Sequence, residues 1–123
     1  MGLDNFVSRS PDHIVLTPED ERTLRDSGID LCGGLCSDGV TSFRGKIYDF
    51  LVAEVTGVSL YELWLPPETL AEMADKLAEC DPENVGERLG LGERFTPNPG
   101  EIRDLTRLFR LCADRGLGLI AWF

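Results

Sequence analysis

Residues 32–57 read CGGLCSDGVTSFRGKIYDFLVAEVTG, a loop rich in glycine and hydroxyl groups that leads into the most apolar helix-like run of the chain. On a helical projection, five apolar side chains between residues 45 and 56 fall on one broad arc, and Gly57 provides the stop. They are Ile47, Tyr48, Leu51, Val52 and Val55. The sequence therefore predicts a central helix over residues 45–56, with the remaining segments as its scaffold.

A shorter helix is predicted near the N-terminus from its capping residues. Thr17 can cap it, Pro18 suits its first position, and Asp20 is placed to complete a capping box. The helix is expected to run to about residue 27, where Gly28 allows a left-handed exit. The apolar run at residues 13–16, just before this helix, is interpreted as a strand.

Two longer helices are predicted in the second half of the chain. One opens at Pro66 and Pro67 and ends near Cys80, and the other starts at Asn98 and ends at Gly116. Their predicted buried stripes are Leu70, Met73, Ala74 and Leu77 in the first, and Ile102, Leu105, Leu108, Phe109 and Cys112 in the second. The opposite side of the last helix carries three arginines, which form either a solvated face or a docking surface: Arg103, Arg107 and Arg110.

The apolar runs at residues 58–65 and 117–123 are interpreted as strands. The second is expected to be a buried strand that closes the core, with Trp122 and Phe123 removed from water. The order of elements predicts a single compact domain over residues 1–123, of the α+β class or a small α/β fold, with about three strands packed against about four helices. Residues 30–44 and 82–98 are predicted to be long loops within it. Parallel pairing of the last two strands would require a right-handed crossover.

The loop ahead of the central helix has the ingredients of an anion site. Its glycines let the backbone approach a ligand, its hydroxyls can donate hydrogen bonds, and two basic residues stand at a helix N-terminus that already favours anions. The candidate ligand-binding residues are Gly33, Gly34, Ser37, Thr41, Ser42, Arg44 and Lys46. Neither the Walker spacing nor the dinucleotide-binding spacing of glycines is present. A purely structural loop is the alternative interpretation.

Glu54 is the one candidate for general acid catalysis. It falls at the edge of the apolar arc of the central helix, where partial loss of hydration would favour the protonated carboxyl group. The alternative places Glu54 at the margin of the helix, in water or paired with Arg44 or Lys46. His13, the single histidine, has no serine or cysteine tied to it by a motif, so no catalytic triad is predicted.

The four cysteines are expected to be reduced and free of metal. Structural zinc sites generally use two close pairs of ligands, whereas here only Cys32 and Cys36 are close, and Cys80 and Cys112 fall on separate predicted helices. No export signal is recognised in the first ten residues, so a compartment that forms disulfides is not expected. We therefore predict no metal, no cofactor and a cytoplasmic location.

The charge of the chain limits its partners. It has 12 Lys and Arg against 22 Asp and Glu, a net charge of -10, which repels a phosphate backbone. Residues 94–123 are the exception, with 5 of the 12 basic residues and 3 of the 22 acidic ones. No apolar run approaches the length of about 20 residues that spans a bilayer. Neither a nucleic-acid nor a membrane partner is expected.

These observations favour a small acidic binding or regulatory module over an enzyme. It would act through protein–protein contacts, with another protein or with a second copy of itself. The alternative is a binder of a small anionic or phosphate-bearing ligand, or a small enzyme, that uses the loop at residues 32–46. Acidity is consistent with either a functional face or simple solvation of the surface.

Overall fold

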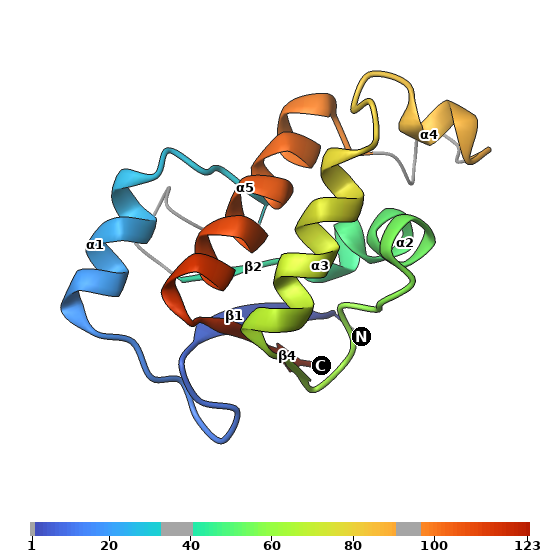
Figure 1. The fold of residues 1–123 in the computed structure, drawn as a ribbon. Helices are drawn as coiled ribbons and strands as arrows, with labels where there is room; N and C mark the ends of the chain where they lie inside the picture. Colours follow the sequence, from blue (N-terminus) through green and yellow to red (C-terminus); the bar gives the residue numbers. More distant parts are fainter. Residues whose placement is uncertain (1, 33–40, 91–96) are drawn as a thin grey trace.

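Two layers make up the described part of the protein: a four-stranded sheet, and helices that cover one of its faces (Figure 1). The computed structural model describes residues 2–32, 41–90 and 97–123. The strands are β1 (Asp4–Ser8), β2 (Ser42–Phe43), β3 (Trp64–Leu65) and β4 (Gly118–Trp122), and the helices are α1 (Pro18–Asp26), α2 (Gly45–Thr56), α3 (Pro67–Ala78), α4 (Val85–Arg88) and α5 (Pro99–Arg115). The α+β class is confirmed, with one more strand and one more helix in these residues than the sequence predicted.

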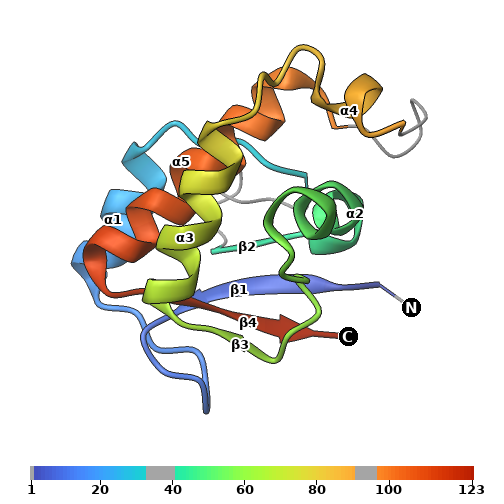
Figure 2. The same ribbon diagram turned by 45° about the vertical axis from the view of Figure 1, so that its right-hand side comes forward.

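The sheet is antiparallel throughout, in the order β2-β1-β4-β3. β1 and β4 pair over their full length, with Asp4 opposite Trp122 and Ser8 opposite Gly118. β3 pairs antiparallel with the other side of β4, so the last two strands need no parallel crossover. Figure 2 shows α2, α3 and α5 on one side of the sheet and no described helix on the other. None of the described helices has the length and apolar character that crossing a bilayer requires.

The strand predicted at residues 13–16 is wrong, and the first strand lies earlier, at β1. The hydroxyl group of Ser8, at the end of β1, accepts a hydrogen bond from the Val15 N–H group (2.9 Å), and the Arg9 N–H group donates to the Val15 carbonyl (2.8 Å). These bonds fold residues 9–15 into a loop against the end of β1. His13 and Ile14 are exposed as a result.

The predicted helix starts and stops are confirmed. Thr17 and Asp20 form the capping box of α1, and Asn98 and Glu101 form a second one at α5. The glycines that follow α2 and α5, Gly57 and Gly116, both take the left-handed conformation, at φ 76° and φ 74°. Local sequence therefore sets the ends of these helices.

The core lies between the helices and the sheet, and the predicted stripes of α3 and α5 are buried in it. On α2, Tyr48, Leu51 and Val52 are buried as predicted, but Ile47 is 41% exposed. The buried face of α2 instead includes Gly45 and Thr56. Gly45 packs so closely against β1 that a Cβ atom there would lie 1.7 Å from the Asn5 Oδ1 atom.

The two predicted strands of the second half are corrected in part. Only β3, the last two residues of the run at 58–65, forms a strand. The preceding residues form a turn, because the Asp49 carboxylate accepts hydrogen bonds from the Ser59 hydroxyl group (3.0 Å) and the Leu60 N–H group (2.7 Å). At the C-terminus β4 forms as predicted, but Trp122 and Phe123 are exposed, at 69% and 53%. Trp122 points to the face of β4 that the helices leave uncovered, whereas Phe123 lies beyond the last residue of the strand.

Candidate functional site

The described part of the predicted anion loop is divided between the sheet and α2. Gly33, Gly34 and Ser37 lie outside the described residues. The Thr41 carbonyl accepts a hydrogen bond from the Val7 N–H group (2.9 Å), and Ser42 is buried in β2, so both belong to the edge of the sheet. Arg44 and Lys46 are exposed at the start of α2.

Oxygen atoms of the protein itself lie close to the N-terminal end of α2. The Lys46 N–H group donates to the Leu3 carbonyl (3.3 Å), and the Asn5 Oδ1 atom lies directly against Gly45. Asn5 is fully buried, and its Nδ2 atom donates to the Leu60 carbonyl (3.0 Å). The Arg44 Nε atom lies 3.8 Å from the Asp4 carboxylate. The Asn5 Oδ1 atom has no hydrogen-bond partner in the described structure, so of these oxygen atoms only the Leu3 carbonyl accepts from an N–H group of the helix end, and anion binding here stays a prediction.

A buried tyrosine connects three segments near this loop. The Tyr48 hydroxyl group donates to the Glu101 carboxylate at the start of α5 and accepts a hydrogen bond from the Cys32 N–H group (2.8 Å). Burial and the neighbouring Glu101 carboxylate both raise the pKa of Tyr48. A cavity of about 330 Å³ opens beside Glu101 and is lined by Asp30, Leu31, Cys32, Asn98 and Glu101. Its two carboxylates make it a poor receptor for an anion.

Replacing Tyr48 with Phe is expected to destabilise the fold by about 2 kcal/mol, because the hydrogen bond to the Glu101 carboxylate is lost and the Cys32 N–H group loses its acceptor. Urea unfolding of the purified protein measures this change. Tyr61→Phe is the matched control, since the ring contact of Tyr61 with Phe123 is retained. Equal stability of the two variants would mean that the Tyr48 hydroxyl group contributes nothing.

Glu54 is exposed to solvent, the position that the sequence left as the alternative. It lines a cavity of about 480 Å³ between α2, α3 and α4, together with Val55, Lys76, Glu79, Cys80, Val85, Arg88 and Leu89. The Lys76 Nζ atom donates to the Thr56 carbonyl (3.1 Å) at the end of α2. Charges of both signs surround this cavity, and a catalytic role for Glu54 stays a prediction.

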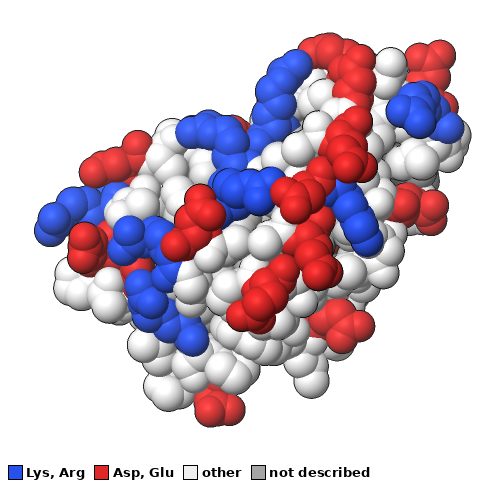
Figure 3. Space-filling model, viewed as in Figure 1, with Lys and Arg blue, Asp and Glu red and all other residues white. Residues whose placement is uncertain are grey.

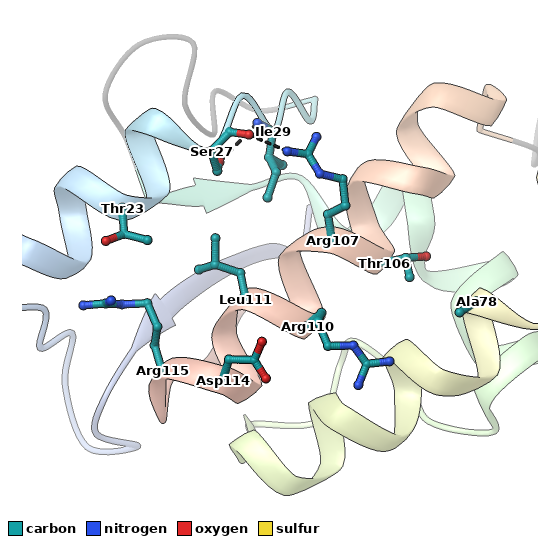
Figure 4. Close-up of a pocket in the computed structure, with 10 residues that line it drawn as sticks. All are labelled: Thr23, Ser27, Ile29, Ala78, Thr106, Arg107, Arg110, Leu111, Asp114 and Arg115. Atoms are coloured by element: carbon teal, nitrogen blue, oxygen red, sulfur yellow. Dashed lines mark hydrogen bonds between the residues drawn. The ribbon is translucent and has the colours of Figure 1, made fainter.

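A cavity of about 540 Å³ lies between α1 and α5 (Figure 4). Ile29 and Leu111 supply its apolar surface, and Arg107 reaches across to donate to the Ser27 carbonyl. The remaining lining residues are Thr23, Ala78, Thr106, Arg110, Asp114 and Arg115. Each of the three guanidinium groups already contacts an aspartate: Arg107 with Asp104, Arg110 with Asp75, and Arg115 with Asp20. The cavity is therefore close to neutral and does not select an anion.

The helix side of the molecule presents acidic and basic side chains intermixed (Figure 3). The arginines on the outer side of α5 belong to this mixture, since Arg103 also pairs with Glu83 (2.8 Å). Exposed ion pairs of this kind contribute little to stability and keep a surface hydrated. The sequence left these arginines as a solvated face or a docking surface, and their described contacts fit the solvated face.

The described cysteines are separated in the fold. Cys32 is exposed, Cys80 is half-buried, and Cys112 is buried in the core, where burial raises the pKa of its thiol to about 12. Cys112 therefore stays protonated and acts as a small apolar side chain. Within residues 2–32, 41–90 and 97–123, no group of three histidine, cysteine or acidic residues could hold a metal ion. The thiol state itself stays a prediction, and Cys36 lies outside the described residues.

The face of the sheet away from the helices carries large apolar side chains. The pairing register places Phe6 of β1, Trp64 of β3, and Ile120 and Trp122 of β4 on this side, and we call these four residues the open sheet face. All four have solvent contact, and Trp122 is the most exposed of them. An antiparallel sheet with one solvated face normally places polar residues outward. Here the outward positions are aromatic and aliphatic.

The side chains of the open sheet face pack against one another. The rings of Phe6 and Trp122 meet edge to face, with their centroids 6.4 Å apart. The indole of Trp64 lies over Gly118, where a Cβ atom would come within 2.4 Å of the ring. The same end of the sheet carries Leu63, 71% exposed, and Phe123, whose ring contacts Tyr61. Both tryptophans of the chain thus lie on one apolar surface.

Comparisons of the chain with protein-family models, with curated proteins and with solved structures found no match. Among the described surfaces, the open sheet face is apolar at positions where a solvated sheet normally carries polar residues.

Proposed function

We propose that the protein is a small acidic binding module that acts through protein–protein contacts, and that the open sheet face is its contact surface. The observation that carries the proposal is the apolar, aromatic character of a sheet face that no described helix covers. Contiguous apolar patches on soluble proteins mark interaction sites. Tryptophan and other aromatic residues are enriched at the centres of protein interfaces, where they contribute most of the binding energy.

The charge distribution favours a protein partner over a nucleic acid. The chain has a net charge of -10, and its outward strand positions hold one charged residue, Asp4, which has Arg44 beside it. A nucleic-acid surface requires clustered positive charge for the phosphates, with aromatic rings between the basic residues. The open sheet face has the rings without the positive charge.

An affinity-capture comparison tests the proposal. The full chain, its Trp122→Ser variant and an Ile47→Ser control are immobilised and exposed to an extract of the source organism. Ile47 is an exposed apolar residue on α2, away from the sheet, so the control removes a similar kind of side chain. We expect a partner protein that the parent and the control retain and that Trp122→Ser loses by about tenfold or more.

The captured partner must then bind the purified parent chain in a two-component titration, with the same loss for Trp122→Ser. Retention of one identical set of proteins by the three chains would contradict the proposal. Loss of binding in Ile47→Ser alone would move the contact surface to the helix side.

The alternative, a binder of a small anionic ligand at the loop of residues 32–46, draws its support from Arg44 and Lys46, which are both exposed at the start of α2. It predicts that inorganic phosphate raises the melting temperature of the parent chain and has no effect after both residues are changed to Gln. That result would not depend on Trp122, so the two functions are separated by independent variants.

A further inference from the structure

We infer that the partner seated on the open sheet face is a second copy of this chain, and that two sheets pack face to face in a symmetric dimer. This inference rests on the proposed function and names its partner. Two antiparallel sheets can pack through their apolar faces at about 10 Å, with side chains of the two faces interdigitating. The dimer would then have four layers, with the helices on the outside.

The composition of β4 supports a second layer of protein over its outer side. Leu119 and Ala121 face the helices and are buried, while Ile120 and Trp122 face outward. A strand that is apolar on both faces is typical of a sheet covered on both sides. In the described residues only one side is covered, so the apolar outer side requires a partner of similar apolar character. The same face of another copy meets that requirement, because a two-fold interface joins identical patches.

Charge also favours this mode of self-association over others. Two copies of a chain with net charge -10 repel each other, and contact through the helix side would bring exposed acidic side chains such as Glu72 and Glu79 together. The open sheet face has no charged member, and Asp4 at its edge lies 3.8 Å from the Arg44 guanidinium. Packing through this face places the two helix layers on the order of 20–30 Å apart, since stacked layers lie about 10 Å from each other. That separation exceeds the Debye length of about 8 Å at physiological salt.

The exposed apolar area can form the centre of an interface. A large aromatic side chain can remove roughly 150–250 Å² from water, so Trp122 at 69% exposure still offers about 100 Å² or more. With the partly exposed Phe6, Trp64 and Ile120, the open sheet face offers on the order of 200–300 Å² of apolar area. A standard interface buries about 800 Å² per partner, of which the outer part is polar.

Intrinsic tryptophan fluorescence reports on the solvent exposure of this surface, because both tryptophans of the chain lie on the open sheet face. As the concentration of the full chain rises from about 1 µM to about 200 µM, we expect the emission maximum to shift to shorter wavelength and acrylamide quenching to fall. Sedimentation velocity on the same samples should show a monomer–dimer equilibrium. Raising NaCl from about 0.05 M to about 0.5 M should strengthen the dimer, because salt screens the repulsion between two acidic copies.

Two matched variants locate the interface. Trp122→Glu adds a negative charge to the open sheet face and should raise the dimer dissociation constant by about tenfold or more, whereas Ile47→Glu adds the same charge to α2 and should leave it unchanged. Both side chains are exposed, so both variants should melt within a few degrees of the parent. If Trp122→Glu does not fold, Trp122→Ser provides the test, with a smaller weakening of the dimer expected because the exposed ring is lost and no charge is added.

The outcomes separate this inference from the proposed function. A parent chain that stays monomeric at about 200 µM in about 0.5 M NaCl overturns the dimer. If that monomer still captures another protein through Trp122, the proposed function stands, and the partner is that protein instead of a second copy of the chain. A dimer weakened by Ile47→Glu and not by Trp122→Glu would place self-association on the helix side and overturn the inference. Salt that weakens the dimer would also overturn it, since attraction between opposite charges would then hold the copies together.

Discussion

Deletion of residues 119–123 is expected to leave a chain without a cooperative unfolding transition. β4 lies inside the sheet, where it pairs with β1 over five residues and with β3 on its other side. The deletion removes the buried side chains of Leu119 and Ala121, leaves β3 without a partner strand and leaves β1 paired only with the short β2. Losing one buried leucine side chain costs about 2–5 kcal/mol, and each unpaired buried amide adds about 1–3 kcal/mol. The total approaches the whole stability of a small domain, about 5–15 kcal/mol.

Thermal and urea unfolding followed by far-UV circular dichroism measure this effect. The matched control is the double variant Trp122→Ser and Phe123→Ser, which keeps the backbone of β4 and removes two exposed rings. It is expected to melt within a few degrees of the parent. A truncated chain that melts as cooperatively as this control would show that β4 is dispensable.

The helices could be predicted from the sequence because their ends are set by neighbouring residues. Thr17 and Asn98 cap their own helices, and Gly57 and Gly116 end theirs, all through bonds within a few residues. A strand is stabilised by partners far away in the chain, so its own composition is a weaker guide. β1 was therefore missed, and residues 13–16 were assigned to a strand although they lie in a loop bound to Ser8.

Only those features of the candidate site whose residues lie within one segment of the chain could be predicted from the sequence. The basic pair at the start of α2 was recognised, but the Asn5 side chain that packs against Gly45 between them comes from β1. The bond between Tyr48 and Glu101 joins residues 53 positions apart, and neither residue stands in a motif. For the open sheet face one signal was present: residues 119–123 are apolar at every position. That pattern predicted a strand buried on both faces, and the described chain covers one face alone.

Asp20 is the second residue whose change should have a large effect. Its side chain is fully buried, and it receives the Arg9 guanidinium at 2.6 Å and the Arg115 guanidinium at 2.8 Å. It also accepts a hydrogen bond from the Thr17 N–H group (3.0 Å) in the capping box of α1. One carboxylate thus joins the end of β1, the start of α1 and the end of α5. The sequence indicated the capping box, whereas the two arginines come from distant segments.

Replacing Asp20 with Asn should destabilise the protein by about 3 kcal/mol, at the low end for removal of one member of a buried ion pair, because both arginines keep some contact with water. The melting temperature is expected to fall by about 10 °C. Asp75→Asn is the matched control, since it also removes an aspartate paired with an arginine of α5, but at an exposed position. Its expected cost is less than about 1 kcal/mol.

The pH dependence identifies the charge of Asp20 as the cause. The Arg9 guanidinium, the Thr17 N–H group and the Arg115 guanidinium hold the pKa of the Asp20 carboxyl group well below its usual range. In the unfolded chain this pKa is about 3.9, so the stabilisation is complete above about pH 5 and is lost as the pH falls below about 4 towards the folded pKa. Urea unfolding from about pH 7 to about pH 2 should therefore show the difference between parent and Asp20→Asn shrinking as the carboxylate is protonated, whereas the smaller difference for Asp75→Asn changes little. A gap for Asp20→Asn that stays constant over this range would mean that packing of the side chain, and not its ion pairs, holds these three elements together.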